Sequence, residues 1–191
     1  MKKKQNSNQV MPFIPINNGN KKKLMDKHSA VNAYVIVKAV DDEVYFAYPE
    51  DIIPAANGQK ITDLLIHCRN QDEVDFIELK GANISCNGQD NPFEQIRRTI
   101  NAMRDSEDLR DIVTGRGQKY AFIVSPERQA IPKNISTPKR VLWKTLKAIG
   151  SEGSQDELIK MVKMVPKVNC MDKTKPQLIC SNDFPLEMPF Q

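Results

Sequence analysis

Residues 61–80 have the sequence ITDLLIHCRNQDEVDFIELK, and this stretch decides the fold that we predict. Its two ends are rich in aliphatic and β-branched residues, which favour strands, whereas residues 69–73 are polar and favour a hairpin connection. We therefore predict antiparallel strands over residues 61–68 and 74–79. Because both strands are apolar, we expect them to lie in the centre of a sheet.

The predicted hairpin places three charged side chains on one face. With an even-length connection, Asp63 lies opposite Lys80. Leu65 then lies opposite Glu78. Because side chains alternate between the two faces of a sheet, Asp63, Glu78 and Lys80 project together. A bulge or an odd-length loop would turn one strand over and separate them.

The elements predicted on both sides of the hairpin come from hydrophobic spacing and helix-end signals. The clearest is a helix that begins after Asn91 as cap, has Pro92 in its first turn, and repeats apolar residues at helical spacing. Strands are predicted over 43–48, 61–68, 74–79 and 119–124, and helices over 24–40, 92–104, 107–113, 137–149 and 155–164.

This element order predicts an α/β fold with a mixed central β-sheet of about four to five strands flanked by helices. Residues 1–23 are rich in Lys and Asn, and we expect them to form a flexible basic arm. Residues 24–191 are predicted to form a single domain, with its core over 26–125 and a C-terminal helical extension over 126–191.

The composition excludes several classes of protein. Hydrophobic residues make up 40% of the 191-residue chain and charged residues 27%, which is ordinary for a soluble globular protein. No apolar run is long enough to span a bilayer, and a polar stretch follows Met1 and its lysines, so we expect no membrane segment and no secretory signal. We expect a cytoplasmic protein. The four cysteines form no CxxC pair, which predicts reduced thiols and no structural zinc site.

Charge is distributed unevenly along the chain, although the total is only +4. Residues 1–27 carry a net +6, residues 40–112 a net −9, and residues 113–191 a net +6. An acidic centre with basic ends fits a metal-binding catalytic site with phosphate-binding flanks. It also fits a soluble domain with solvated lysines, and charge patterning alone favours this second interpretation.

The cluster of Asp63, Glu78 and Lys80 suits one kind of chemistry. A charged residue in a central strand needs a partner or a metal, and two carboxylates favour a hard cation such as Mg²⁺ or Mn²⁺. A neighbouring lysine can orient an attacking water or stabilise negative charge on a phosphate. These groups are the parts needed to hydrolyse a phosphodiester. The alternative is a cross-strand salt-bridge cluster on an exposed face. His67 shares this face, either as a general base or, as we favour, as a packed strand residue.

These residues resemble the PD-(D/E)xK nuclease superfamily. The likeness consists of Thr62-Asp63, Glu78-Leu79-Lys80 and the element order of residues 26–125. It implies a restriction-endonuclease-like core, in which Asp63, Glu78 and the Leu79 carbonyl bind Mg²⁺ or Mn²⁺ and Lys80 is the catalytic lysine. It also implies a role for Gln95, which lies on the helix that follows the second motif.

Two departures from the family pattern concern the first motif and the first helix. Thr62 stands where many members have proline. Many members also carry a metal-binding glutamate on the first helix, and residues 24–40 contain none. Glu43 or Asp26 are candidate substitutes.

Basic side chains on two predicted helices are candidate contacts to nucleic acid. They are Arg97, Arg98, Lys139, Arg140 and Lys144, and each also fits a solvated helix surface. We thus expect a metal-dependent nuclease of bacterial or phage defence, restriction or repair, acting on DNA more readily than RNA. The alternatives are a ribonuclease with the same site, or a catalytically silent module that binds nucleic acid or protein. A homodimer or a partner protein is compatible with each function.

Overall fold

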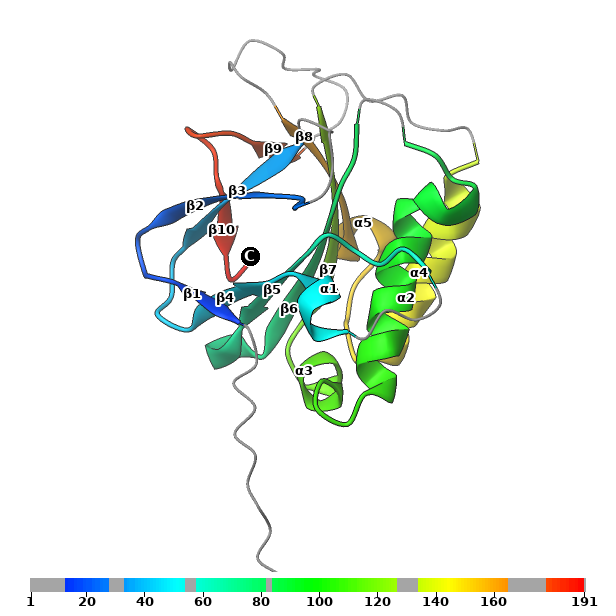
Figure 1. Cartoon of the computed structure of the whole chain (residues 1–191), viewed down its shortest axis with the longest axis horizontal. Coiled ribbons are helices and arrows are strands. Elements are labelled where there is room, and N and C mark those ends of the chain that lie inside the picture. The colour runs from blue at the N-terminus through cyan, green and yellow to red at the C-terminus, as the bar shows by residue number, and fades with distance from the viewer. Residues whose placement is uncertain are drawn as a thin grey trace, which may run out of the picture.

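Two β-sheets and a layer of helices make up the computed structural model (Figure 1), which describes residues 13–27, 33–53, 58–81, 84–126, 134–164 and 178–190. The larger sheet has seven strands in the order β1-β4-β5-β6-β7-β8-β9. Its strands are β1 (Ile14–Ile16), β4 (Val44–Ala47), β5 (Leu64–Cys68), β6 (Glu73–Leu79), β7 (Lys119–Pro126), β8 (Ile159–Met164) and β9 (Leu178–Cys180). The smaller sheet consists of β10 (Leu186–Met188), β3 (Tyr34–Ala39) and β2 (Lys21–Met25), in that order. The helices are α1 (Pro49–Ile52), α2 (Pro92–Asp105), α3 (Arg110–Thr114), α4 (Ser136–Ala148) and α5 (Gln155–Leu158), with 3-10 turns η1 (Arg69–Gln71) and η2 (Gly88–Asp90).

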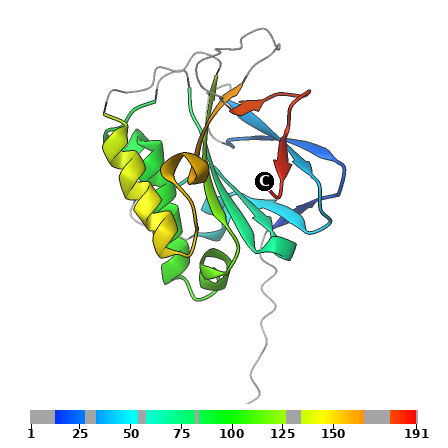
Figure 2. The same ribbon diagram turned by 180° about the vertical axis from the view of Figure 1, so that it is seen from behind.

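The larger sheet is the middle of three layers. The smaller sheet covers one of its faces, and α2 and α4 cover the other, as the two opposite views show (Figures 1 and 2). Strands β4, β5 and β6 pair antiparallel, whereas β6, β7, β8 and β9 pair parallel, so the sheet is mixed. This confirms the predicted α/β class with a mixed central sheet, but the sheet has more than the predicted four to five strands.

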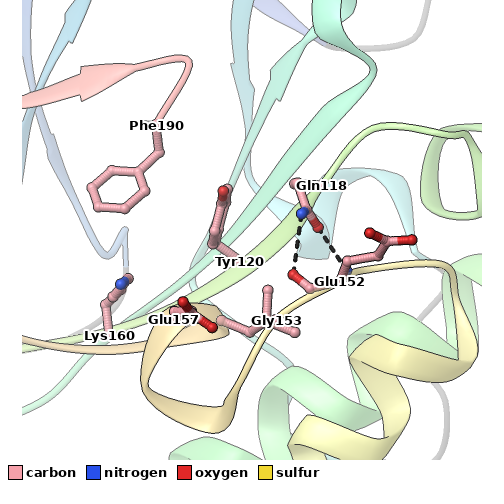
Figure 3. A pocket seen from close by; sticks show the side chains of 8 residues that line it. Gln118, Tyr120, Glu152, Gly153, Glu157, Lys160 and Phe190 are labelled. Atoms are coloured by element: carbon pink, nitrogen blue, oxygen red, sulfur yellow. Dashed lines mark hydrogen bonds between the residues drawn. The ribbon is translucent and has the colours of Figure 1, made fainter.

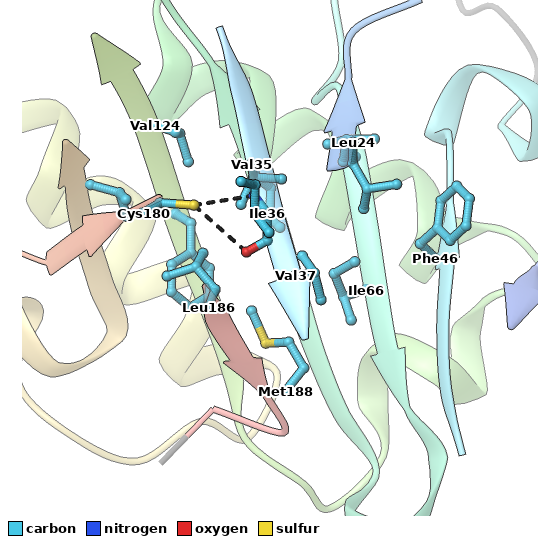
Figure 4. Close-up of a cluster of buried hydrophobic side chains, with 14 of the residues drawn as sticks. Leu24, Val35, Ile36, Val37, Phe46, Ile66, Val124, Cys180, Leu186 and Met188 are labelled. Carbon is cyan, nitrogen blue, oxygen red and sulfur yellow. Dashed lines mark hydrogen bonds between the residues drawn. The ribbon is translucent and has the colours of Figure 1, made fainter. Parts of the chain in front are cut away.

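Both faces of the larger sheet are apolar because both are covered. The core between the two sheets brings together β-branched and aliphatic side chains of distant segments, such as Val37, Ile66 and Leu186 (Figure 4). The core on the helix face includes Leu65 and Phe76 from the sheet. Burial on both sides explains why the strands of residues 61–80 are nearly continuous apolar runs.

The hairpin of β5 and β6 has the predicted face pattern in a different register. Leu65 pairs with Phe76, and Cys68 pairs with Glu73 across η1, so the pairing is shifted by two residues from the predicted one. Because side chains alternate with a period of two, a shift of two residues keeps every side chain on its predicted face. The predicted register was wrong and the predicted shared face of Asp63 and Glu78 was right.

Helix α2 connects β6 to the parallel strand β7 and begins as predicted. The Asn91 side chain accepts hydrogen bonds from the backbone amides of Phe93 and Glu94, and Pro92 occupies the first turn. Its apolar stripe, which includes Ile96 and Ile100, is fully buried against the larger sheet. The helix therefore has a fixed rotation, and that rotation determines which of its polar residues face the sheet.

Three predictions about the ends of the chain were wrong. Within the predicted helix 24–40, residues 24–25 belong to β2 and residues 34–39 form β3, because their apolar side chains pack between the two sheets; residues 28–32 lie outside the described residues. The predicted arm forms strands from Ile14 onward, although residues 1–12 lie outside the described residues. In the predicted helix 155–164 only the first four residues are helical, and the predicted helical extension also contains β8, β9 and β10. The division into an arm and one domain stays a prediction.

No helix in the described part of the chain is long and apolar enough to cross a membrane.

Candidate active site

Asp63, Glu78 and Lys80 meet on the helix face of the larger sheet, where β5 begins and β6 ends. Glu78 is fully buried, and its Oε1 lies 2.6 Å from the Lys80 Nζ. Asp63 directly precedes β5, and its Oδ2 accepts a hydrogen bond of 2.6 Å from the Leu79 amide. The observed register, continued by one residue, places Asp63 level with Glu78. The structure therefore brings these predicted site residues together.

Gln95 joins this cluster from α2. The Lys80 ammonium donates a hydrogen bond of 2.7 Å to Gln95 Oε1, and Gln95 is itself buried. Lys80 is thereby held between the carboxylate of Glu78 on one side and the amide of Gln95 on the other. The prediction that Gln95 lies at the site is confirmed in its placement.

Two threonines connect the start of β5 to the helix. The Thr62 amide donates to Thr99 Oγ1 at 2.9 Å, and the Thr62 hydroxyl donates to the Ile77 carbonyl at 3.0 Å. Both threonines are buried. A threonine in the position before Asp63 thus provides a hydrogen-bond donor that proline could not, and it fixes the backbone beside the acid.

Asp63 and Glu78 are buried, and burial disfavours their ionised forms. Burial, reinforced by the nearby charge of Asp63, raises the pKa of Glu78 to about 8 against the opposing effect of Lys80. Burial also raises the pKa of Asp63 to about 6, although the Leu79 amide lowers it. Neither carboxylate oxygen of Glu78 has a hydrogen-bond partner with good geometry. The single positive charge of Lys80 is therefore not enough to stabilise both acids as anions.

Two further acids lie near the open side of Asp63. The charges of Asp26, which follows β2, and Glu50, on α1, each contribute to the raised pKa of Asp63. Asp26 is one of the two substitutes that we considered for the missing helix glutamate. The other substitute, Glu43, is at the opposite end of β5, where it accepts a hydrogen bond from the Tyr45 hydroxyl and approaches Arg69.

Lys60 and Glu50 were missed by sequence reasoning. The charges of Glu78 and Asp63 contribute to a raised pKa of Lys60, which therefore lies near the acids while its ammonium pairs with Asp90 at 2.6 Å. Neither residue belongs to a periodic element or a motif, so no signal in the sequence identifies it. Lys60 adds an exposed positive charge near the acidic cluster.

The predicted nucleic-acid contacts form two groups. Arg97 and Arg98 lie on α2 and both pair with Glu94, at 2.6 and 3.2 Å. On α4, Lys139 pairs with Asp156, whereas Arg140 and Lys144 are exposed. Among the contacts of the described residues, none joins the α4 group to the acidic cluster. Their role in binding nucleic acid stays a prediction.

Two other predictions concern His67 and Leu79. His67 is almost fully buried on β5 and packs edge-on against Phe13, with ring centroids 5.9 Å apart, and burial lowers its pKa. This confirms the packed histidine that we favoured. The predicted metal-binding role of the Leu79 carbonyl stays a prediction.

Comparison with protein-family models, with curated proteins and with solved structures finds no match to this chain.

Proposed function

We propose that this chain is a metal-dependent nuclease that hydrolyses phosphodiester bonds, with DNA as its first candidate substrate and a restriction-endonuclease-like arrangement around its site. The observation that carries the proposal is the convergence of Asp63, Glu78, Lys80 and Gln95 at one end of the central sheet. A salt-bridge cluster on an exposed face, the competing interpretation, does not fit a glutamate that is fully buried.

The residues present fit a hard divalent cation. Glu78 has two buried carboxylate oxygens, one of which pairs with the Lys80 ammonium, and Asp63 lies beside it with one oxygen bound to an amide. Carboxylate oxygens are the ligands that Mg²⁺ and Mn²⁺ prefer. Asp63 and Glu78 would hold the ion, and Asp26 and Glu50 are near enough to influence it through their charge. When bound, such an ion lowers the pKa of a bound water and neutralises phosphate charge.

Lys80 and Gln95 provide the remaining parts of the proposed mechanism. The Lys80 side chain is still partly exposed, at 16%, so that its ammonium can reach a substrate while Glu78 and Gln95 fix its position. Held there, it orients the attacking water and stabilises the charge that develops on the phosphate oxygens. Gln95 has only a positioning role, because it is buried and contacts Lys80.

A cleavage assay on a panel of nucleic acids tests this proposal. Supercoiled plasmid, linear duplex, single-stranded DNA and RNA are each incubated with the full chain and Mg²⁺, Mn²⁺ or EDTA. We expect cleavage that requires the cation and that Asp63→Ala abolishes. Cleavage confined to RNA would favour the ribonuclease alternative. No cleavage of any substrate with either cation, together with salt-dependent binding, would instead support the catalytically silent module.

A further inference from the structure

A second acidic cluster lies on the other face of the same hairpin, towards the smaller sheet. Cys68, at the end of β5, pairs directly with Glu73 on β6, and Asp75 follows Glu73 on the same face. Their exposed fractions are 1%, 5% and 0%. The thiol sulfur and one carboxylate oxygen of each acid all lie within 4.8 Å of one another. Three possible metal ligands therefore converge inside the protein, in a region that the proposed nuclease chemistry does not use.

Asp75 supplies an independent indication that a ligand is missing. It is fully buried, and its carboxylate oxygens accept no hydrogen bond from an N–H or hydroxyl donor, with only the Glu73 carboxyl beside them. Among the ion pairs of the described residues, none involves Asp75 or Glu73, in contrast to Glu78 and its lysine. A buried carboxylate without partners is costly, so natural proteins neutralise it with a cation, a metal or a proton.

Two aromatic residues lie next to the cluster. Asp75 pairs with Tyr120 of β7, and Tyr120 packs against Phe190 with ring centroids 5.3 Å apart. The Phe190 amide donates a hydrogen bond of 2.6 Å to Glu73 Oε1, and this bond leaves the second oxygen of Glu73 available. The segment after β10 therefore closes over the acids without contributing a positive side chain.

A cavity reaches the edge of the cluster at Glu73. It has a volume of about 400 Å³, and its lining includes Glu73, Arg116, Tyr120 and Phe190. A neighbouring cavity of about 390 Å³ shares Tyr120 and Phe190 with it and continues along α5 (Figure 3). An ion can thus reach Glu73 without unfolding of the sheet.

We propose that Cys68, Glu73 and Asp75 form a second metal site, which takes a borderline transition-metal ion such as Zn²⁺. A thiolate together with carboxylates suits zinc, whereas Mg²⁺ is bound through oxygen alone. Bonds of about 2.0–2.3 Å in a tetrahedral site bring ligand atoms to within about 3.5 Å of each other, so a modest contraction of the cluster completes three positions. A water from the cavity completes the fourth.

Charge and position indicate a structural role for this ion. A divalent ion compensates two of the three negative charges, and the Phe190 amide stabilises Glu73 further. The ion would link β5 to β6 beside the C-terminal segment, whose Phe190 amide binds Glu73. A proton shared between Glu73 and Asp75 is the competing occupant.

Cobalt binding tests the site, because Co²⁺ replaces zinc and a cobalt–thiolate bond gives a near-ultraviolet charge-transfer absorption. The full chain is titrated with Co²⁺ in excess Mg²⁺, which saturates the proposed nuclease site. We expect one equivalent to produce the absorption, and Zn²⁺ to displace it. Cys68→Ser should abolish it, and Asp75→Asn should weaken binding at least tenfold. Cys86→Ser, which changes a thiol outside the cluster, should leave it unchanged.

Two results would overturn the second site. One is the absence of the absorption in the folded wild-type chain, which is the result that a shared proton predicts. The other is an equal absorption in Cys68→Ser. If Cys68→Ser does not fold, thermal unfolding of the wild type decides: Zn²⁺ should raise Tm by several degrees, and an unchanged Tm contradicts the site. Glu78→Gln should keep the cobalt absorption, so that failure of the nuclease proposal and failure of this one are distinguishable.

Discussion

The two faces of β6 carry two acidic clusters that differ in their neighbours. On the helix face, Glu78 has the Lys80 ammonium at 2.6 Å, and a buried glutamine holds that ammonium from the other side. On the face towards the smaller sheet, Asp75 has only the Glu73 carboxyl and a thiol beside it, and it accepts no hydrogen bond from an N–H or hydroxyl donor. Both clusters are buried and both contain two acids.

The difference indicates that burial of acids alone does not define a reactive site. A lysine that is partly exposed can contact a substrate, and on the helix face Lys80 lies directly beside the acids. On the other face the Phe190 amide binds Glu73, and among the described residues no ion pair joins a lysine or arginine to the acids of the cluster. The proposed catalysis therefore belongs to the helix face, and the proposed second ion to the opposite face.

The largest effect should come from removing the lysine that distinguishes the two faces. Lys80→Ala should lower the cleavage rate by about 1,000-fold, because it removes the positive group next to the reacting phosphate. The measurement is single-turnover cleavage of the substrate that the panel identifies. Lys38→Ala is the matched control, since Lys38 pairs with Glu187 at 2.8 Å on the remote smaller sheet. Equal losses of cleavage rate in Lys80→Ala and Lys38→Ala would contradict a special role for the helix-face lysine.

A smaller loss is expected when the support of that lysine is removed. Gln95→Ala should lower the cleavage rate by roughly 10–100-fold, because Lys80 loses the acceptor that fixes its ammonium. Single-turnover rates measure the loss, and Gln95→Glu, which retains an acceptor, should recover part of it. An Ala variant with the wild-type rate would show that Gln95 is only a packing residue.

The two clusters should also contribute separately to the pH dependence of the free energy of unfolding. The pKa values of Glu78 and Glu73 are raised from 4.5 to about 8 and about 7. The folded state then holds protons that the unfolded state loses, so the stability of the metal-free chain falls as pH rises through this range. Urea unfolding in EDTA at pH 5, 6, 7 and 8 measures the fall.

Substitution assigns each part of this pH dependence. Glu73→Gln should reduce the decrease in the free energy of unfolding up to about pH 7. Glu78→Gln should reduce the decrease that continues to about pH 8. We expect each reduction to be about 1–3 kcal/mol. A profile that is as steep in Glu78→Gln as in the wild type would mean that Glu78 is not buried in a protonated form.

The smallest effect is expected at the edge of the helix-face site. Lys60→Ala should weaken nucleic-acid binding by about two- to fivefold and reduce the dependence of log Kd on log salt by about one, because one phosphate contact is lost. Fluorescence anisotropy at several salt concentrations measures both quantities. An unchanged salt dependence would place Lys60 outside the binding surface.

Part of this structure could be predicted from the sequence because strand faces follow a period of two. Asp63 and Glu78 were assigned to one face correctly although the register was wrong by two residues. The capped start of α2, which determines where Gln95 lies, was also predictable, because Asn91 and Pro92 are local signals. Local sequence signals were sufficient for the strand faces and for the start of α2.

The remainder depends on contacts between segments that are distant in the sequence. Residues 34–39 have apolar positions that fit a helix or a strand, and pairing with β2 and β10 decides for the strand. The second cluster was missed because Cys68 and Glu73 become neighbours only across the hairpin, and spacing rules for metal ligands do not include that arrangement. Asp26 and Glu50 approach Asp63 through tertiary structure alone.

The central claim is that Asp63 and Glu78 hold a divalent cation next to Lys80, and anomalous diffraction from crystals soaked in Mn²⁺ tests it most directly. We predict an anomalous peak at about 2.1–2.3 Å from a carboxylate oxygen of each acid. Wild-type crystals that diffract well but show no Mn²⁺ at this position, with Glu78 still bound only to Lys80, would contradict the account.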